Sequence, residues 1–383
     1  MSQPTEKLPS VADNAIQRLL QTLGLPEATS ITSAKATAEY HSIYFITLPE
    51  SRASLGHSEL VLRVSGCHIP IIKTRNEIGV MAWLSRNTTI PIPDVVAYDE
   101  SENNPTNHEY TLLSKVNGVT LSNIYDTLDD NQATQILDQL IDILTQLHSH
   151  PFTGIGGLAL DPTGTPVLSQ VLDENFWQLP DIGKYWPGET ITTLNIQGPY
   201  NSYIGYTSAQ VALYIRLITL HPTLEFMRDL IPRLEAFISI LPSCSAKLND
   251  VALRLAHKDL HFANILFDTS TNKITAVLDW EFSGVVPFTK WNPSRSFLWN
   301  GKYDEASREE KKKWMGMFEK RCVERGCEML LRDAQYKSEL QDDMQMVVDY
   351  LRAIVEVSPR AQRKELVGGW REVVEKALAK FGV

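Results

Sequence analysis

Long apolar runs and clustered cysteines are both missing from this 383-residue sequence. No apolar stretch approaches the roughly 20 residues that a membrane-spanning helix needs. The first residues lack the basic segment followed by an apolar one that marks a secretory signal. We expect reduced thiols, because the four cysteines are scattered and form no metal-ligand cluster: Cys67, Cys244, Cys322 and Cys327. These absences predict a cytosolic protein without a membrane partner.

An excess of basic residues is missing as well. The formal net charge is −10, which argues against nonspecific binding to nucleic acid. The hydrophobic fraction of 43% and the charged fraction of 21% are ordinary for a globular protein. A chain of this length can form two lobes around a cleft and is too long for one small core. We expect a monomer that binds no nucleic acid.

A short hairpin is predicted near the middle of the C-terminal half. Two apolar runs, Ile265 to Phe267 and Ile274 to Leu278, flank a polar turn, which is the pattern of two paired strands. Such a hairpin holds Asn264 at one end and Asp279 at the other. We therefore expect these two polar residues to lie together, beside Asp259.

This set of side chains fits phosphoryl transfer from a magnesium nucleotide. The first carboxylate, Asp259, can accept the proton of an attacking hydroxyl group. The amide of Asn264 and the carboxylate of Asp279 offer the oxygen ligands that Mg²⁺ prefers. The spacing from His257 through Asp259 to Asn264 matches the kinase catalytic-loop pattern H-x-D-L-x-x-x-N. The alternative is a purely structural role, in which the segment is a polar turn with a buried histidine and surface carboxylates.

The two motifs together resemble a known family. The segment HKDLHFAN begins at His257, and LDWE ends at Glu281. They look like the H-x-D-L-H-x-x-N and D-W-E motifs of the aminoglycoside/choline phosphotransferase family, small-molecule kinases with a protein-kinase-like fold. A second histidine, and Trp-Glu in place of Phe-Gly, separate them from protein kinases. The resemblance implies an α+β fold of two lobes, ATP and Mg²⁺ as cofactors, and a small-molecule hydroxyl acceptor.

Within this resemblance the chain divides into three parts. Residues 1–36 form an N-terminal helical extension, 37–117 a small β-rich lobe that binds nucleotide, and 118–383 a larger, mainly helical lobe. Apolar residues recur at helical spacing from Val11 to Leu23, and that helix is predicted to pack on the small lobe. The helical lobe holds the catalytic loop, the metal site and an insertion that binds the acceptor.

The phosphate-covering turn is unusual because it contains no glycine. Residues 42–48 and 59–65 read as strands, and the segment before the first of them is Glu39-Tyr40-His41-Ser42. The resemblance implies that such a turn covers the nucleotide phosphates. Ser42 can still donate its hydroxyl to a phosphate, while His41 can equally be an exposed loop residue.

Arg63 stands where the kinase pattern has a lysine that contacts the nucleotide phosphates. Arginine is a permanent cation with a planar fork, so it can contact phosphate but differs from lysine in geometry. Residues 74–85 form a predicted amphipathic helix, on which Glu77 is placed to meet Arg63. The alternative is a solvent-facing arginine and an unrelated helical glutamate.

A hinge between the lobes is predicted from two extended segments. Prolines hold residues 90–98 out of the helical region, and 110–118 read as a buried strand that enters a turn. The resemblance implies that adenine lies against this hinge. Its hydrogen bonds then come from main-chain groups of Ser114, Lys115 and Val116.

The acceptor region, residues 151–241, is the least readable part. We interpret the glycine-rich segment 154–158 as a turn, because it does not match a phosphate-binding loop. Helices are predicted at 207–220 and 224–241, then at 308–332, 339–355 and 359–381. The aromatic residues of this region can shape a pocket, together with Trp291, Asn292 and Trp299 farther along the chain.

The acceptor itself stays open, because a fold does not determine a substrate. An amino alcohol, a sugar, an aminoglycoside or a secondary metabolite all remain. A polycationic antibiotic would need an acidic pocket, which four residues can supply unless they are surface charges: Asp173, Glu174, Asp181 and Glu189.

A different class of protein is also open, a catalytically silent, kinase-like protein that binds a nucleotide or metabolite. The missing glycines and Arg63 favour it. The complete set of Asp259, Asn264 and Asp279 opposes it, because binding alone does not require all three. A protein kinase is disfavoured by the D-W-E motif.

Overall fold

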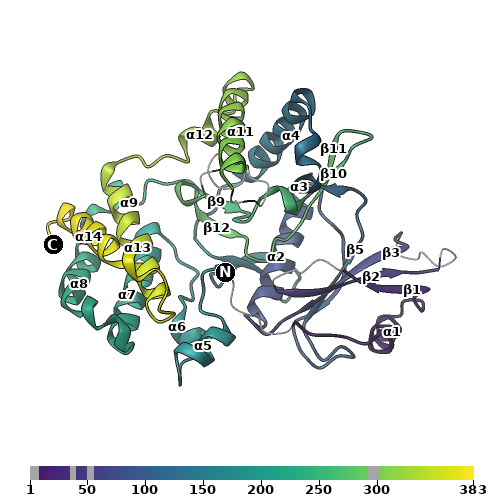
Figure 1. Cartoon of the computed structure of the whole chain (residues 1–383), viewed down its shortest axis with the longest axis horizontal. Helices are drawn as coiled ribbons and strands as arrows, with labels where there is room; N and C mark the ends of the chain where they lie inside the picture. Colours follow the sequence, from purple (N-terminus) through teal and green to yellow (C-terminus); the bar gives the residue numbers. More distant parts are fainter. Residues whose placement is uncertain are drawn as a thin grey trace.

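A five-stranded antiparallel sheet lies at one end of the computed structural model (Figure 1). The structure describes residues 8–34, 40–49, 56–291 and 304–383, together with 293, 298 and 302. The strand order is β1-β2-β3-β5-β4. We call this sheet and its two helices the small lobe, with these bounds: β1 (Ser30–Ser33), β2 (His41–Thr47), β3 (Glu59–Ser65), β4 (Val95–Asp99), β5 (Tyr110–Ser114), α1 (Asp13–Thr22) and α2 (Ile72–Asn87).

Helix α1 packs on the sheet, as its apolar spacing predicts. Its buried face includes Ile16, Leu19 and Leu20, and it shares one core with β2, β3 and β5. The chain turns away from the helix at Gly24, two residues after Thr22, and Gly24 adopts φ +71°. There the Leu25 N–H donates to the Leu20 carbonyl at 2.9 Å, a glycine-dependent helix end.

The rest of the chain forms the helical lobe. Its first half contains β6 (Val119–Thr120), α3 (Leu121–Ile124), η2 (Tyr125–Thr127), α4 (Asp130–His148), β7 (Gly157–Leu160), β8 (Pro166–Ser169), α5 (Leu179–Tyr185), α6 (Ile191–Leu194), α7 (Tyr203–Leu220), η3 (Pro222–Leu230), α8 (Ile231–Ile240), η4 (Leu241–Cys244) and α9 (Ser245–Leu248). Its second half contains β9 (Leu253–Ala256), η5 (Phe262–Asn264), β10 (Ile265–Asp268), β11 (Lys273–Val277), β12 (Gly284–Pro287), η6 (Phe288–Lys290), α11 (Glu305–Glu324), α12 (Met329–Arg332), α13 (Glu339–Val357) and α14 (Lys364–Lys380).

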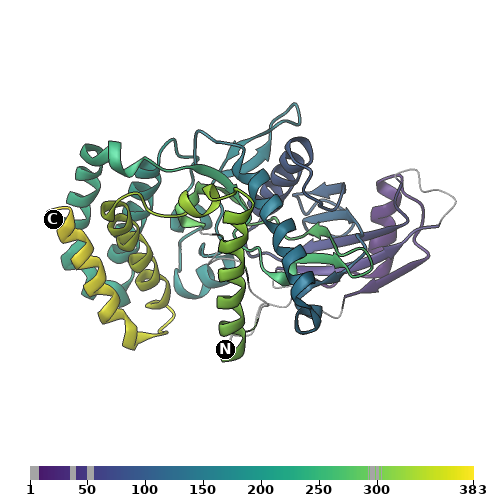
Figure 2. The same ribbon diagram turned by 90° about the horizontal axis from the view of Figure 1, so that it is seen from above.

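Two separate cores stabilise the helical lobe. One joins α4 and α11 to the predicted hairpin, whose strands β10 and β11 pair antiparallel as expected. The other joins α7, α8, α13 and α14, the group at the left of Figure 1 and Figure 2. The catalytic loop after β9 therefore lies between the sheet and this second group of helices.

Two predictions about the helical lobe are wrong in detail. The helix expected over 308–332 is interrupted, because Gly326 adopts φ +67° and ends α11. The segment 154–158, interpreted as a turn, instead leads into strand β7. A Cβ atom on Gly156 would lie 2.3 Å from the Ser169 carbonyl oxygen, so glycine permits the close approach of β8. Among the described residues, no helix is both long and apolar enough to cross a membrane.

Candidate active site

The loop between β9 and η5 brings Asp259 and Asn264 together. The side-chain nitrogen of Asn264 donates to the Asp259 carbonyl at 2.9 Å and to its Oδ2 at 3.2 Å. The Leu278 N–H donates to the Asn264 carbonyl at 2.8 Å, which closes the hairpin end directly before Asp279. Lys258 and Asp279 both adopt a positive φ, at 65° and 66°. Such conformations are costly for residues other than glycine and often occur at functional sites.

His257 braces this loop through both of its ring nitrogens. Its Nε2 donates to the Leu278 carbonyl at 2.7 Å, so its Nδ1 can accept from the Asp259 N–H at 3.3 Å. The ring is fully buried and lies 4.5 Å from the Trp280 ring. Burial lowers the pKa of His257, so the ring stays neutral and acts as a structural link between the two motifs.

Arg63 on β3 makes the predicted contact with Glu77 on α2. Its Nη1 donates to Glu77 Oε1, and its Nη2 donates to Asp279 Oδ1 at 2.8 Å. Burial by itself lowers the pKa of Arg63, but the neighbouring carboxylates raise it above the ordinary value. One guanidinium thus joins the small lobe to the second carboxylate of the site.

Arg63 and Glu77 border a buried cluster of charged and polar side chains that the sequence did not reveal. Lys73 Nζ donates to Glu281 Oε2 at 3.0 Å, and Arg63 Nη2 lies 3.7 Å from the same oxygen. His41 lies between these groups, 3.3 Å from Arg63 and 3.4 Å from Glu281. Lys73 could have been found because it precedes Glu77 by one helical turn and shares its face.

Burial decides the charges in this cluster. Lys73 and Glu281 are 1% and 2% exposed, and His41 is 4% exposed. Burial and the nearby Lys73 lower the pKa of His41 well below its usual range, so His41 is neutral. The Glu281 side chain points into the same buried cluster and accepts from Lys73.

Asn76 links α2 to the loop that follows Asp279. Its Nδ2 donates to the carbonyls of Glu281 and Ser283, both at 2.8 Å. Its Oδ1 accepts from the Leu158 N–H at 2.8 Å. The two lobes are therefore joined through α2 as well as through the hinge.

Of the three described hinge residues predicted to contact adenine, only Val116 has a main-chain N–H without a hydrogen-bond partner. The N–H of Ser114 donates to the Asp94 carbonyl at 2.9 Å, and that of Lys115 donates to the Glu59 carbonyl at 3.0 Å. The main chain of Val116 has no such partner among the described residues. Of the three predicted adenine contacts, Val116 is thus the best placed to donate.

The Ser42 hydroxyl, predicted to donate to a phosphate, makes a hydrogen bond within the protein. Its hydroxyl donates to the Pro9 carbonyl at 2.5 Å, and the residue that turns toward Arg63 is its neighbour His41. His41 is buried in strand β2, so the interpretation as an exposed loop residue is wrong. Glu39 lies outside the described residues.

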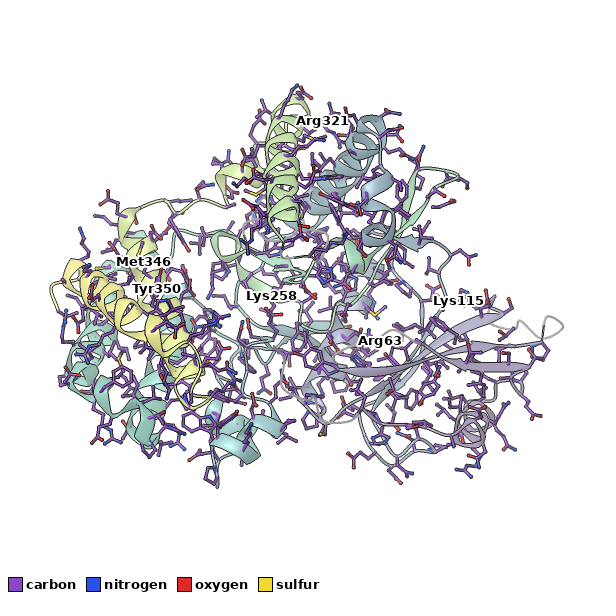
Figure 3. All side chains as sticks on the ribbon, viewed as in Figure 1. Arg63, Lys115, Lys258, Arg321, Met346 and Tyr350 are labelled. Atoms are coloured by element: carbon purple, nitrogen blue, oxygen red, sulfur yellow. The ribbon has the colours of Figure 1, made fainter. Side chains whose placement is uncertain are left out.

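A cavity of about 260 Å³ opens beside Asp259. Figure 3 places Lys258, the residue before Asp259, between the strand that carries Arg63 and helix α13, which carries Tyr350. Asp173 and Glu174, two of the four predicted acidic residues, line the cavity. The other two pair elsewhere, Asp181 with Arg360 and Glu189 with Arg216. Asn292 and Trp299 lie outside the described residues.

The chemistry of Asn264 and Asp279 suits a magnesium ion. The side-chain nitrogen of Asn264 donates to Asp259. The Oδ1 atom of Asn264 receives no hydrogen bond from a described residue. The Asp279 side chain is 34% exposed and therefore accessible. Mg²⁺ is commonly held by one or two protein oxygens together with substrate phosphates. Within the described ranges, no group of three or more His, Cys, Asp or Glu side chains forms a separate metal site.

The sheet lobe, the helical lobe and the catalytic loop between them define the kinase-like fold of aminoglycoside phosphotransferases. The chain belongs to the phosphotransferase enzyme family, which matches residues 41–289. The resemblance inferred from the two motifs is thereby confirmed. A thermostable mutant of aminoglycoside phosphotransferase APH(4)-Ia in its apo form is similar in fold, with a TM-score of 0.50 and 14% identity. That match covers 96% of this chain and 99% of the other.

Relatives of similar sequence come from fungi. A subtelomeric hrmA-associated cluster protein of Aspergillus fumigatus is 23% identical over 257 residues, 56% of this chain and 50% of that protein. The clavilactone A biosynthesis cluster protein Y of Ampulloclitocybe clavipes is 26% identical over 225 residues, with the same two shares, 56% and 50%. The chain spans about half the length of the curated relatives that it matches.

Proposed function

We propose that this protein is a small-molecule kinase that transfers the γ-phosphoryl group of Mg-ATP to a hydroxyl group. The observation that carries the proposal is the contact of Asn264 with Asp259 at one end of a hairpin whose other end carries Asp279, beside a cavity. Family membership supports the reaction class, because the matched range contains all three residues.

Asp259 receives the hydroxyl group of the acceptor in this proposal. Its side chain is 42% exposed, so it is open to the cavity that it lines. The acceptor oxygen forms the new bond to phosphorus, the bond from phosphorus to the ADP oxygen breaks, and the acceptor proton passes to Asp259. The products are a phosphate monoester and ADP.

Asn264 and Asp279 would hold Mg²⁺ through their side-chain oxygens. The bound ion supplies positive charge that offsets the charge of the nucleotide phosphates. Arg63, oriented by Glu77, would contact the phosphates from the small lobe. Ser42 would have to leave the Pro9 carbonyl before it could do so.

The nucleotide would lie between the lobes, with its base at the hinge. Ser114, Lys115 and Val116 contribute main-chain groups there, and Val116 has an N–H group to donate. The hinge falls between β5 and β6. We accordingly keep the division into the extension 1–36, the nucleotide lobe 37–117 and the helical lobe 118–383 as part of this proposal.

A catalytically silent binding protein is the second candidate. The observation in its favour is that Arg63 donates directly to Asp279 and so competes for an oxygen that a metal ion would need. A chain specialised for binding alone can keep that ion pair. A kinase has to exchange it for contacts with the metal and the phosphates.

Turnover separates the two candidates. We would measure magnesium-dependent ATP consumption by the full chain with a panel of hydroxylated small molecules, using Asp259→Ala, Asp259→Asn and Asp279→Ala. The two Asp259 variants should lose at least about 10²-fold in kcat, since a positioned general base contributes 10²–10⁴-fold. Asp279→Ala should also lose turnover, because it removes a ligand of the magnesium ion. Asp250→Ala, which removes an exposed carboxylate paired with Lys337, is the matched control and should keep full activity. Full activity of Asp259→Ala, with its fold confirmed by circular dichroism, would refute the assignment.

A further inference from the structure

The charged residues around the cavity are mostly paired with one another. Lys258 donates to the Leu172 carbonyl at 2.6 Å and lies 3.5 Å from Asp173. The carboxylate of Asp173 also accepts from the N–H groups of Asn175, and its pKa is lowered to about 2, since Lys258 and these hydrogen bonds outweigh burial. These two charges are therefore satisfied inside the protein.

A second pair is satisfied in the same way. Arg352 Nη1 donates to Glu356 Oε2 at 2.8 Å. Glu356 also lies 3.3 Å from Arg360. A ligand in the cavity would gain little from either member, since each already has a partner of opposite charge.

Lys290 and Asp349 differ from these pairs. Both line the cavity, and neither forms an ion pair with another residue that the structure describes. Lys290 is a half-buried residue, and its ammonium nitrogen lies 5.3 Å from the centre of the Tyr206 ring. Burial lowers the pKa of this ammonium group, although attraction from Asp349 and Asp173 opposes that shift. Asp349, on α13, is exposed and accepts one hydrogen bond, from Gln345 at 2.6 Å. Glu174 also lines the cavity without an ion pair to a described residue, and burial raises its pKa to about 7. Among the described lining residues, Lys290 is thus the unpaired cation, and Asp349 and Glu174 are unpaired carboxyl groups.

Two uncharged groups accompany these charges. The indole nitrogen of Trp291, next to Lys290 in the chain, is buried and has no hydrogen-bond partner among the described residues. The side-chain oxygen of Gln210 on α7, the helix packed against α13, is likewise buried without a partner. Buried polar groups normally have a partner, so each points to an unfilled hydrogen bond. The lining thus offers two donors, on Lys290 and Trp291, and two acceptors, on Asp349 and Gln210.

Size restricts the ligand further. The volume of about 260 Å³ lies below the roughly 300–1,000 Å³ of pockets for drug-sized ligands. The remaining wall is largely apolar, with the aromatic Phe176, Trp177, Tyr214 and Phe282 beside aliphatic residues such as Leu194, Leu213 and Val355. The lining carries three basic residues, Lys258, Lys290 and Arg352, and five acidic ones, Asp173, Glu174, Asp259, Asp349 and Glu356. Size rather than charge therefore disfavours a bulky polycation.

We propose that the acceptor is a compact zwitterion, a hydroxylated amino acid or a close analogue. Its carboxylate binds Lys290 and the Trp291 N–H, its ammonium group binds Asp349 and Gln210, and its hydroxyl group reaches Asp259. Lys290 and Asp349 are specificity-determining residues in this arrangement. The inference rests on the proposed function only for the role of Asp259.

Binding is tested without turnover, by saturation-transfer NMR on the full chain. The probes are L-serine, L-threonine, L-homoserine, L-tyrosine and trans-4-hydroxy-L-proline, each with its amide and its N-acetyl form. We expect at least one parent amino acid to bind at least tenfold more tightly than both derivatives. Kanamycin, a polycation, should bind more weakly than that parent. Failure of every parent to bind, equal binding of the derivatives, or tighter binding of kanamycin would overturn the inference.

Variants assign each end of the ligand. Lys290→Met should abolish the preference for the acid over the amide, while Lys290→Arg should retain it. Asp349→Asn should abolish only the preference for the amine over its N-acetyl form. Lys337→Met, which removes an exposed lysine that is not part of the cavity lining, is the control and should change neither. Retention of both preferences in Lys290→Met and Asp349→Asn would contradict the assignment.

The two proposals fail separately. A parent amino acid that binds with both charge preferences but supports no ATP consumption refutes the kinase and leaves the binding site. ATP consumption that depends on Asp259 but occurs only with kanamycin refutes the zwitterion and leaves the kinase.

Discussion

Replacing Lys73 with methionine tests the buried cluster behind Arg63. The side chains of Lys73 and Glu281 are only 1% and 3% exposed, and their charged atoms are 3.0 Å apart. Removing one member of such a buried pair typically destabilises a protein by about 3–5 kcal/mol, because the other charge is left without a partner. Arg63, 3.7 Å from the same Glu281 oxygen, compensates in part. We therefore expect a loss of about 3 kcal/mol in the free energy of unfolding.

An exposed pair provides the matched control. Lys337 Nζ lies 2.6 Å from Asp250, closer than in the buried pair, but these side chains are 46% and 60% exposed. Exposed ion pairs contribute about 0–1 kcal/mol, so Lys337→Met should have a small effect. Urea denaturation of both variants measures the difference. Equal destabilisation by Lys73→Met and Lys337→Met would show that burial does not set the strength of the cluster.

A double variant separates the lost pair from the stranded charge. Glu281→Gln in the Lys73→Met background removes the unpaired carboxylate, so it should recover part of the lost stability. If the double variant is as unstable as the two single variants added together, the two side chains do not interact, and the reasoning fails.

Three further predictions follow from the site and its support. Arg63→Lys should raise the KM for ATP, because one ammonium cannot reproduce a fork that meets two carboxylates; an unchanged KM in steady-state kinetics would place this side chain away from the phosphates. His41 stays neutral when folded because its pKa is lowered by burial, whereas the unfolded chain takes up its proton below pH 6.5. Below that pH the free energy of unfolding should fall by up to about 1.4 kcal/mol per pH unit. His41→Gln should reduce this pH dependence, measured by urea denaturation between pH 7 and 5.5. An unchanged pH dependence would contradict a neutral, buried His41. In Gly157→Ala the added Cβ would lie 2.4 Å from Asn76 Oδ1, which should cost about 1–3 kcal/mol, whereas Gly183→Ala, with nothing within 4 Å, should not destabilise; equal melting temperatures would refute this.

Local patterns in the sequence predicted the catalytic loop and the helices well. Asn264 and Asp259 are five residues apart, and a hairpin carries the chain from Asn264 to Asp279. Such short connections leave few alternatives, so spacing alone predicts that the three residues meet. The Arg63 to Glu77 contact was predictable because a strand followed directly by a helix constrains both ends.

Contacts between distant segments were decided only by the tertiary structure. Lys73 and Glu281 are 208 residues apart in the chain, and no local pattern marks them as partners. From the sequence, the Ser42 hydroxyl could be expected to bind phosphate. In the structure it donates to the carbonyl of Pro9, which belongs to a separate segment. Likewise, Lys290 and Asp349 resemble any surface charges in the sequence. Whether a charge is paired, buried or left facing a cavity depends on which segments pack together, and that is settled by packing across the whole chain.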